Sequence, residues 1–235
     1  MACMIRLDRR PPPGQYCLTV SNISPEADLA KLEQRLRSSG GPLDNFIHHK
    51  SQFGTGESHF ATVQFFCATD CERFRHECDG MLFSGRRIRV TPLKRSSGWS
   101  PTPLELSASN AIELMNHFVG FNGWSSEIIG IQLISASSVG PHSAGASSSR
   151  GANSDCHAGF EAKVVVKVAG SDIAIQGVGV GDTGTILAGA AGFEAVARRK
   201  KSAITNAVKA ALSRLIIVLF PSGKVVVREV GAAAG

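Results

Sequence analysis

The chain has 235 residues, 43% of them hydrophobic, which is enough for two small domains with packed cores. Its 25 Lys and Arg residues outnumber the 19 Asp and Glu residues, and the resulting net charge of +6 favours an acidic partner such as nucleic acid. No run of about 18 apolar residues occurs, which argues against a transmembrane helix, so we expect no membrane partner.

The six cysteines do not form a metal-binding pattern. No Cys-x-x-Cys pair occurs, and Cys67, Cys71, His76 and Cys78 lack the paired spacing of a zinc knuckle. We therefore expect no metal and no cofactor, and reduced thiols in an intracellular protein. The motifs of zinc proteases, α/β-hydrolases and P-loop enzymes are also absent, so we expect no catalytic residues and a binding protein rather than an enzyme.

Residues 1–14 end in three prolines and a glycine, and we predict a disordered or extended arm there. The arm has no apolar core of a signal peptide, and an organelle-targeting segment is the alternative. Residues 15–95 then predict a domain with the order βαββαβ, which is a ferredoxin-like, split βαβ fold. Its strands are expected at 16–20, 46–47, 59–66 and 86–90, and its helices from Ser24 or Pro25 to about Gly41 and at 68–78.

Three segments of this domain resemble the RNA-recognition motif, namely Asn22-Ile23, HFATVQF and GRRIRV. In that family bases stack on aromatic side chains of the two central strands. The resemblance implies that Phe60 is such a platform, whereas Thr62 and Thr19 replace aromatics, and each lost stack forfeits about 1–3 kcal/mol per base. A protein-interaction version of the fold is the alternative. The candidate RNA-contacting residues are Phe60, Thr62, Arg86, Arg87, Arg89 and Lys94.

Residues 96–103 have the composition of a linker, and 104–230 predict a second domain. Ser107 or Ser109 is expected to cap a helix that runs through Phe118 to a glycine turn. Strands are predicted at 128–134, 160–168 and 173–180, with a disordered loop at 135–155 because its composition is of low complexity. Gly179 to Gly184 match the pattern GxGxxG, but the acidic residue of a dinucleotide site is missing about 20 residues on, so glycines of a bent strand or a loop are favoured.

A basic helix follows. It is predicted to bury one apolar stripe, formed by Ile204, Val208, Ala211 and Leu215. A second stripe carries cations and hydroxyls that suit a phosphate backbone, although a solvated helix face is the alternative. That stripe consists of Arg198, Ser202, Thr205, Lys209 and Ser213. Beyond it, apolar residues 216–220 and 225–227 flank a Pro-Ser-Gly turn and predict a hairpin, the alternative being a helix continued to Phe220.

The segments VGFNGWSSEII and FEAVARRKKSAITNAVKAAL resemble the DNA-annealing module of the Rad52 recombination proteins. The continuation RLIIVLFPSGKVVV resembles the Rad52-motif-containing proteins, which carry an RNA-recognition motif in front. The resemblance covers residues 104–229 and implies an α+β chain: a ferredoxin-like RNA-recognition motif, then a helix–β-sheet–helix annealing-type domain. In the family this helix holds single-stranded DNA by its backbone. Lys209 matches a family lysine, whereas Ala210, Ser213 and Asn110 replace family arginines.

The resemblance implies a non-enzymatic protein that binds single-stranded DNA, and also RNA, in recombination and double-strand-break repair or the DNA-damage response. We expect a nuclear protein, with the cytoplasm and nucleolus as further compartments, and a homo-oligomer formed through the second domain. Two alternatives are an RNA-processing factor with an oligomerising scaffold and a protein–protein adaptor. The candidate DNA-contacting residues are Arg198, Arg199, Lys200, Lys201, Thr205 and Lys209.

Overall fold

A computed structural model of the chain describes residues 2–12, 14–50, 59–93, 104–135, 157–181, 184–185 and 190–230. The chain is of the α+β class, and its internal contacts divide it into two compact units. The first unit comprises Met1–Gly123 together with Leu215–Gly235, and the second comprises Trp124–Arg214. The predicted boundary at 96–103 is therefore not the only division, because residues 104–123 and 215–235 group with the N-terminal part. The predicted linker itself lies outside the described residues.

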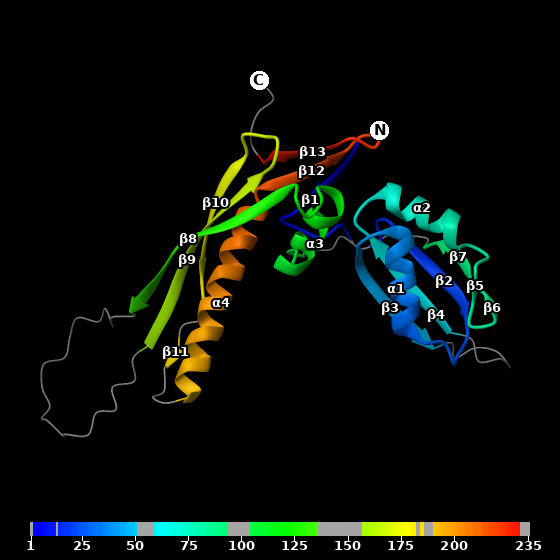
Figure 1. The fold of residues 1–235 in the computed structure, drawn as a ribbon. Coiled ribbons are helices and arrows are strands. Elements are labelled where there is room, and N and C mark those ends of the chain that lie inside the picture. Colours follow the sequence, from blue (N-terminus) through cyan, green and yellow to red (C-terminus); the bar gives the residue numbers. More distant parts are fainter. Residues whose placement is uncertain are drawn as a thin grey trace, which may run out of the picture. The chain divides into compact units, whose positions relative to one another are not determined.

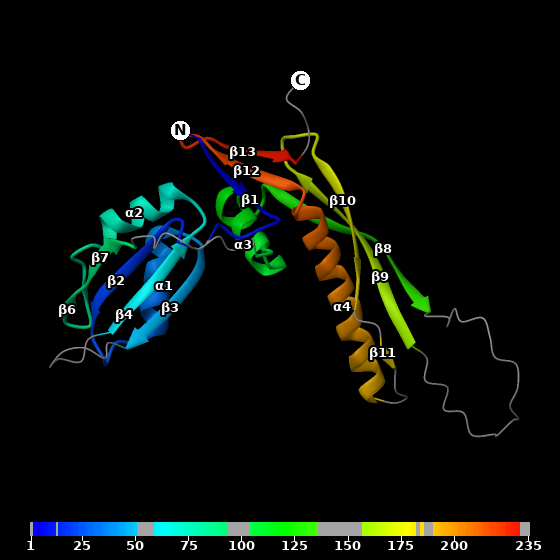
Figure 2. The ribbon, with the colours of Figure 1, turned by 180° about the vertical axis from the view of Figure 1, so that it is seen from behind.

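The first unit contains the predicted split βαβ fold. Four antiparallel strands form a sheet in the order β3-β4-β2-β7, and the strands are β2 (Cys17–Ile23), β3 (Leu43–Lys50), β4 (His59–Phe65) and β7 (Arg89–Pro92). Two helices, α1 (Leu29–Gly40) and α2 (Ala68–Cys78), pack on one face of this sheet (Figure 1), and Figure 2 shows the sheet from its other face. The strands β5 (Leu82–Phe83) and β6 (Arg86–Arg87) form a short separate hairpin.

Alternation along β4 builds the core of this fold. Ala61, Val63 and Phe65 are fully buried beneath the two helices, whereas Phe60 and Thr62 point to the other face, as predicted. The first helix begins at Leu29, later than predicted, because the Asp28 carboxylate accepts hydrogen bonds from the backbone N–H groups of the first turn.

Of the two alternatives predicted for residues 1–14, disordered or extended, the disordered one is wrong at Cys3–Arg6, which form a strand. Strand β1 (Cys3–Arg6) pairs antiparallel with β12 (Leu215–Leu219), which pairs in turn with β13 (Val225–Glu229). Ile5 and Leu7 are buried, and the free energy of burying these side chains orders the segment. The hairpin predicted after the basic helix is present as β12 and β13, so the alternative of a continued helix is wrong.

The helix α3 (Ala108–Phe118) has the predicted cap, since the Ser107 hydroxyl accepts a hydrogen bond from the Asn110 backbone N–H at 3.1 Å. Its segment belongs to the first unit through an ion pair of 2.8 Å between Arg37 and Glu113 and a backbone bridge between Arg9 and Glu105. The helix leads into a tight turn at Gly120, whose φ of 89° favours glycine.

The second unit is an antiparallel sheet with one long helix on one face (Figures 1 and 2). Its strands are β8 (Trp124–Ser135), β9 (His157–Val168), β10 (Ala174–Val180) and β11 (Gly184–Thr185), and its helix is α4 (Ala190–Leu212). Strand β9 pairs with β8, β10 and β11. The helix covers β9 and β10. The strands lie where the sequence predicts them, although β8 begins earlier; residues 136–156 of the predicted loop are outside the described residues.

Glycines of β10 let α4 approach the sheet closely. A Cβ atom on Gly179 would lie only 2.5 Å from the Ala203 carbonyl oxygen and still closer to the Ala207 nitrogen, and Gly177 is equally close to Ala207 and Ala211. The glycine-rich segment therefore serves helix–sheet packing, in which backbone lies against backbone.

The same contact confirms the predicted buried stripe only in part: Val208 and Ala211 are buried on α4, but Ile204 is not. The sheet-facing stripe of α4 is Ala203, Ala207 and Ala211, each fully buried, whereas Ile204 is only half-buried. Leu215, the last residue of the predicted stripe, lies in β12 rather than on the helix. The larger Ile204 was expected to face the core, but only methyl groups fit between the helix and the glycines of β10.

Candidate nucleic-acid interface

The polar stripe predicted on the basic helix is present on α4. At about 100° per residue, Arg198, Thr205 and Lys209 lie on the side of the helix opposite the buried alanines. Arg198 and Thr205 are exposed, and Ser202 and Lys209 are half-buried. The close packing of the alanine stripe fixes which way these side chains face. Cations and short hydroxyls on one rigid helix face suit the oxygens of a phosphate backbone.

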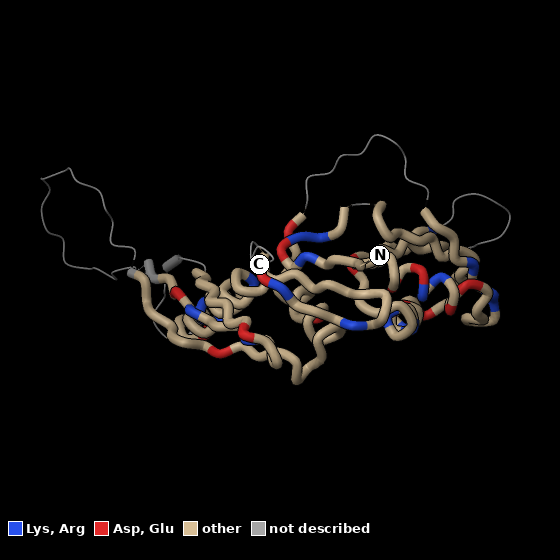
Figure 3. Tube along the Cα trace, turned by 90° about the horizontal axis from the view of Figure 1, so that it is seen from above, with Lys and Arg blue, Asp and Glu red and all other residues tan. Residues whose placement is uncertain are grey.

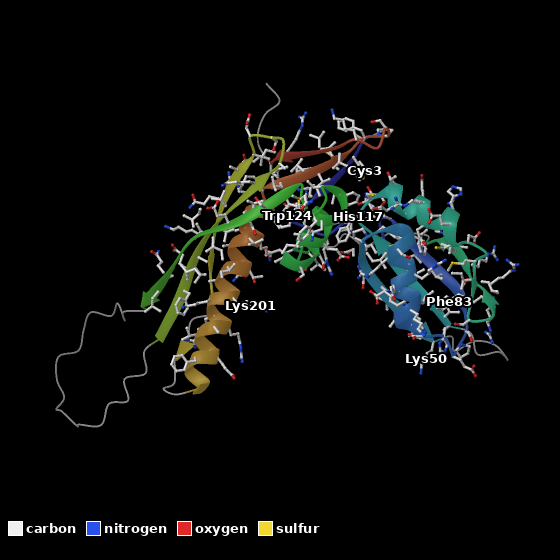
Figure 4. All side chains as sticks on the ribbon, viewed as in Figure 1. Cys3, Lys50, Phe83, His117, Trp124 and Lys201 are labelled. Carbon is white, nitrogen blue, oxygen red and sulfur yellow. The ribbon has the colours of Figure 1, made fainter. Side chains whose placement is uncertain are left out.

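The other predicted cations do not all join this face. The Lys200 ammonium lies 5.2 Å from the centroid of the Phe160 ring, at the side of the helix next to β9. Arg199 is half-buried on the side toward β10, with its carbonyl oxygen against Gly181. Lys201 is exposed and lies midway along α4 (Figure 4). The run of four cations is therefore spread around the helix, and Arg198 and Lys201 extend the Lys209 face.

The back of the sheet, away from α4, is less suited to phosphate. There Lys163 lies 3.7 Å from Glu161, and Lys167 lies 2.8 Å from Glu127. Figure 3 shows basic and acidic residues interspersed along the strands of this unit. Within each ion pair the negative charge offsets the positive one, so the α4 face is the better anion-binding surface of the second unit.

Strand β8 presents an exposed apolar stripe. Ile128, Ile131 and Leu133 pair with buried residues of β9 and share their face of the sheet, yet they are 51%, 41% and 58% exposed. They are exposed because α4 covers β9 and β10 but scarcely reaches β8. Exposed apolar groups of this extent on an edge strand are typical of an interaction surface.

The outer face of the sheet in the first unit gathers part of the predicted RNA site. Phe60 stacks on His49, with ring centroids 4.7 Å apart and planes at 17°. Thr62 pairs with Thr19 across the strands, and its hydroxyl oxygen lies 3.3 Å from His49 Nε2. Arg89 pairs with Ser21 and, by alternation, belongs to the same face. Phe60, Thr62 and Arg89 are thus brought together, and His49 joins them although the sequence reasoning did not identify it.

The remaining predicted basic residues of this domain lie elsewhere. Arg86 and Arg87 are on the short β6 strand, where Arg87 Nη1 donates a hydrogen bond to the Gly80 carbonyl at 3.1 Å. Lys94 lies outside the described residues. The hairpin β5–β6, marked by Phe83 in Figure 4, is separate from the four-stranded sheet, so only Arg89 of the predicted basic edge lies on the Phe60 face.

Phe121 differs from expectation. The sequence favours core or inter-helix packing of Phe121 and Trp124 over a base-stacking role, but Phe121 is 83% exposed and Trp124 is half-buried. Phe121 lies in the turn after α3. Among the described residues no group of His, Cys, Asp and Glu could hold a metal, and no described helix is long and apolar enough to span a membrane.

Comparisons with known proteins agree with this architecture. Residues 94–219 match the model of the Rad52/22 family of double-strand break repair proteins. RAD52 motif-containing protein 1 of Gallus gallus is 28% identical over 232 residues, which are 97% of this chain and 80% of the relative. The Macaca fascicularis protein of the same name is 31% identical over 116 residues, 41% of each chain.

Among solved structures, the third RNA-recognition motif of Mip6 is 15% identical, with a TM-score of 0.29, and covers 34% of this chain and 94% of that chain. The C-terminal RNA recognition motif of RBM19 is 22% identical, with a TM-score of 0.31, and covers 37% of this chain and 83% of that chain. The family match spans more than half of the chain and includes α3, the sheet of the second unit and α4. The chain therefore belongs to the Rad52/22 family of double-strand break repair proteins.

Proposed function

We propose that the chain is a non-enzymatic protein that binds single-stranded DNA through its phosphate backbone, in recombination and double-strand-break repair or the DNA-damage response. The observation that carries this proposal is the cation and hydroxyl stripe of α4, which contains Arg198, Thr205 and Lys209 and lies opposite a tightly packed alanine face. Membership of a family of double-strand break repair proteins supports it. We propose the nucleus as its compartment, with the cytoplasm and nucleolus as further compartments.

Phosphate contacts predict binding with little dependence on base sequence and a steep loss of affinity with salt. Fluorescence anisotropy of the full chain with a labelled single-stranded oligonucleotide, at two salt concentrations, tests the proposal. Duplex DNA of the same length serves as the control for strand preference. Binding that does not weaken with salt would count against phosphate contacts.

RNA is a second ligand, favoured by the face that carries Phe60 and Arg89. Replacing Phe60 with alanine is expected to lower affinity for single-stranded RNA about tenfold, because one stacked base is worth about 1–3 kcal/mol. Leu82→Ala is the matched control, since Leu82 is an exposed apolar residue on β5, outside the sheet. Anisotropy with an RNA oligonucleotide is the measurement. Equal RNA binding by the Phe60 variant and the wild type would remove this face from the RNA site.

A homo-oligomer formed through the β8 stripe completes the proposal. Leu133→Glu is expected to shift the assembled protein toward the 24.8 kDa single chain, because it places a charge in an apolar contact. Val178→Glu is the control, since Val178 is similarly exposed on β10 but faces the opposite side of the same sheet. Light scattering after size-exclusion chromatography measures the mass. A wild-type protein that elutes as a single chain would contradict the oligomer.

A further inference from the structure

A cavity of about 230 Å³ lies within the first unit. Its walls come from β1, from residues 9–12, 15 and 16, and from Phe66, which follows β4. Met4, the neighbour of Cys3 in the chain (labelled in Figure 4), belongs to the β1 wall. The described walls include neither Phe60 nor any residue of α4, so the cavity is separate from both surfaces assigned above.

A buried amide holds one wall of the cavity in place. Gln64 is 8% exposed, and its side-chain N–H donates to the Pro12 carbonyl oxygen at 3.0 Å. The same amide nitrogen lies 3.4 Å from the carbonyl oxygens of Pro11 and Gln15. The Gln15 backbone N–H donates to the Pro12 carbonyl at 3.0 Å. The loop of this wall is thus anchored to β4 and needs little ordering when a ligand binds.

Tyr16, at the end of this loop, has an unusual backbone conformation. Its φ is 55°, in the left-handed region that a bulky residue rarely adopts. Its carbonyl accepts the Phe65 backbone N–H at 3.0 Å, so the sheet holds the residue there. Strained residues of this kind cluster at ligand sites, where the surrounding structure keeps them in place. The half-buried Tyr16 therefore gives the cavity a fixed aromatic wall.

Three arginines line the cavity, and two of them are paired with carboxylates. Arg6 donates to both carboxylate oxygens of Asp8 at 2.8 Å. Arg10 Nε lies 3.0 Å from Oδ1 of the buried Asp44, which fixes the Arg10 guanidinium and leaves it further N–H donors. Arg9 is exposed and takes part in neither pair. The cavity therefore combines the cation of Arg9 and the spare donors of Arg10 with an aromatic wall.

We propose that this cavity binds a nucleoside 5′-monophosphate, with the phosphate at Arg9 and Arg10 and the base against Tyr16. A guanidinium presents its N–H donors in a planar fork that matches the oxygens of a phosphate. The cavity is smaller than the roughly 300–1,000 Å³ of sites that enclose a drug-sized molecule, so it suits one nucleotide rather than several.

The charge of the phosphate adds selectivity. A phosphate monoester carries a charge of about −1.5 to −2 at pH 7, whereas each phosphate within a strand carries a single charge. The Arg9 cation therefore favours a terminal phosphate over an internal one. This chemistry occurs both in a free mononucleotide and at the 5′ end of a nucleic-acid strand. The site is independent of the phosphate contacts proposed for α4.

Calorimetric titration of the full chain with deoxyadenosine 5′-monophosphate (dAMP) tests the site. We expect saturable binding of dAMP, and binding at least about tenfold weaker for deoxyadenosine and for inorganic phosphate, because each lacks one of the two contacts. Absence of binding at millimolar dAMP, or equal affinity for dAMP and deoxyadenosine, would overturn the proposal.

A matched pair of variants locates the site. Arg9→Gln is expected to weaken dAMP binding at least about tenfold, because it removes the cation. Arg35→Gln is the control, since Arg35 is an exposed arginine of α1 that does not line the cavity. Arg9→Gln is also expected to bind a 5′-hydroxyl single strand as the wild type does, which separates this site from α4, and thermal unfolding checks its fold. Equal affinity of the two variants for dAMP would contradict the assignment.

Competition distinguishes the two sources of the ligand. Displacement of dAMP by a short 5′-phosphorylated oligonucleotide assigns the site to a strand end, and retention of dAMP assigns it to a free mononucleotide. The same oligonucleotide with a 5′-hydroxyl group is expected to leave dAMP bound in either case. If the 5′-hydroxyl strand displaces dAMP as effectively as the phosphorylated one, the cavity does not select a terminal phosphate and the proposal is wrong.

Discussion

Replacing Gly179 with alanine is expected to disrupt the second unit, at a cost of about 3 kcal/mol or more in its free energy of unfolding. The new methyl group would collide with backbone atoms of Ala203, Asn206 and Ala207, none of which can rotate away as a flexible side chain could. Overpacking a rigid contact costs about 1–3 kcal/mol even where side chains adjust. Here the helix itself would have to move off the sheet.

Urea unfolding, monitored by circular dichroism, measures this effect. Gly130→Ala is the matched control, because Gly130 lies on β8 of the same sheet and a Cβ there would meet no described atom within 4 Å. The control is expected to unfold within about 0.5 kcal/mol of the wild type. If Gly179→Ala and Gly130→Ala unfold alike, α4 does not pack on β10 as described.

Reversing two charges on the α4 stripe is expected to reduce affinity for single-stranded DNA about 100-fold. In the double variant Arg198→Glu, Lys209→Glu, each reversal removes a phosphate contact and adds repulsion. We expect each to lower the affinity about tenfold, which corresponds to about 1.4 kcal/mol of binding free energy. Both residues lie away from the alanine stripe, so the melting temperature is expected to change little. The slope of the logarithm of the binding constant against the logarithm of the salt concentration should also become shallower, by about 1.4 for two lost contacts on a single strand.

A control of equal charge isolates the role of position. Lys224→Glu with Arg228→Glu makes the same change in net charge at two exposed cations of the β12–β13 hairpin. This variant is expected to bind single-stranded DNA within about threefold of the wild type, because distant surface charges are screened by salt. Equal losses in the two double variants would show that net charge, not the α4 face, determines binding.

Local patterns were sufficient to predict most of the first fold. The alternation of Phe60, Ala61, Thr62 and Val63 indicates a half-buried strand, and this signal needs only a few neighbouring residues. The helix at Ala68–Cys78 was predicted with its observed bounds, because Asp79-Gly80 ends it. Strand β1 was missed because its partner β12 lies more than 200 residues away, and nothing local in Cys3–Arg6 indicates that pairing.

The buried face of α4 was predicted only in part, for a different physical reason. Hydrophobic periodicity gives weight to large side chains such as Ile204, whereas the side chains that face the glycines of β10 are alanines. Small-residue packing becomes visible only when the helix and β10 are considered together. The polar stripe was predicted nonetheless, because Arg198 and Lys209 lie on the side of the helix away from the buried residues in either arrangement.

His49 was missed because its contact with Phe60 depends on the register of β3 against β4. Two adjacent histidines in the second strand were the available signal, but residue type alone does not give a cross-strand partner.

The central claim is that the chain holds single-stranded DNA by phosphate contacts on α4. Titration of the full chain with a labelled single-stranded oligonucleotide, at low and at physiological salt, tests it most directly. We predict tight binding at low salt that weakens steeply as salt rises, with a slope of about −0.7 for each phosphate contacted. No binding at low salt, or binding that is unchanged between the two salt concentrations, would contradict the claim.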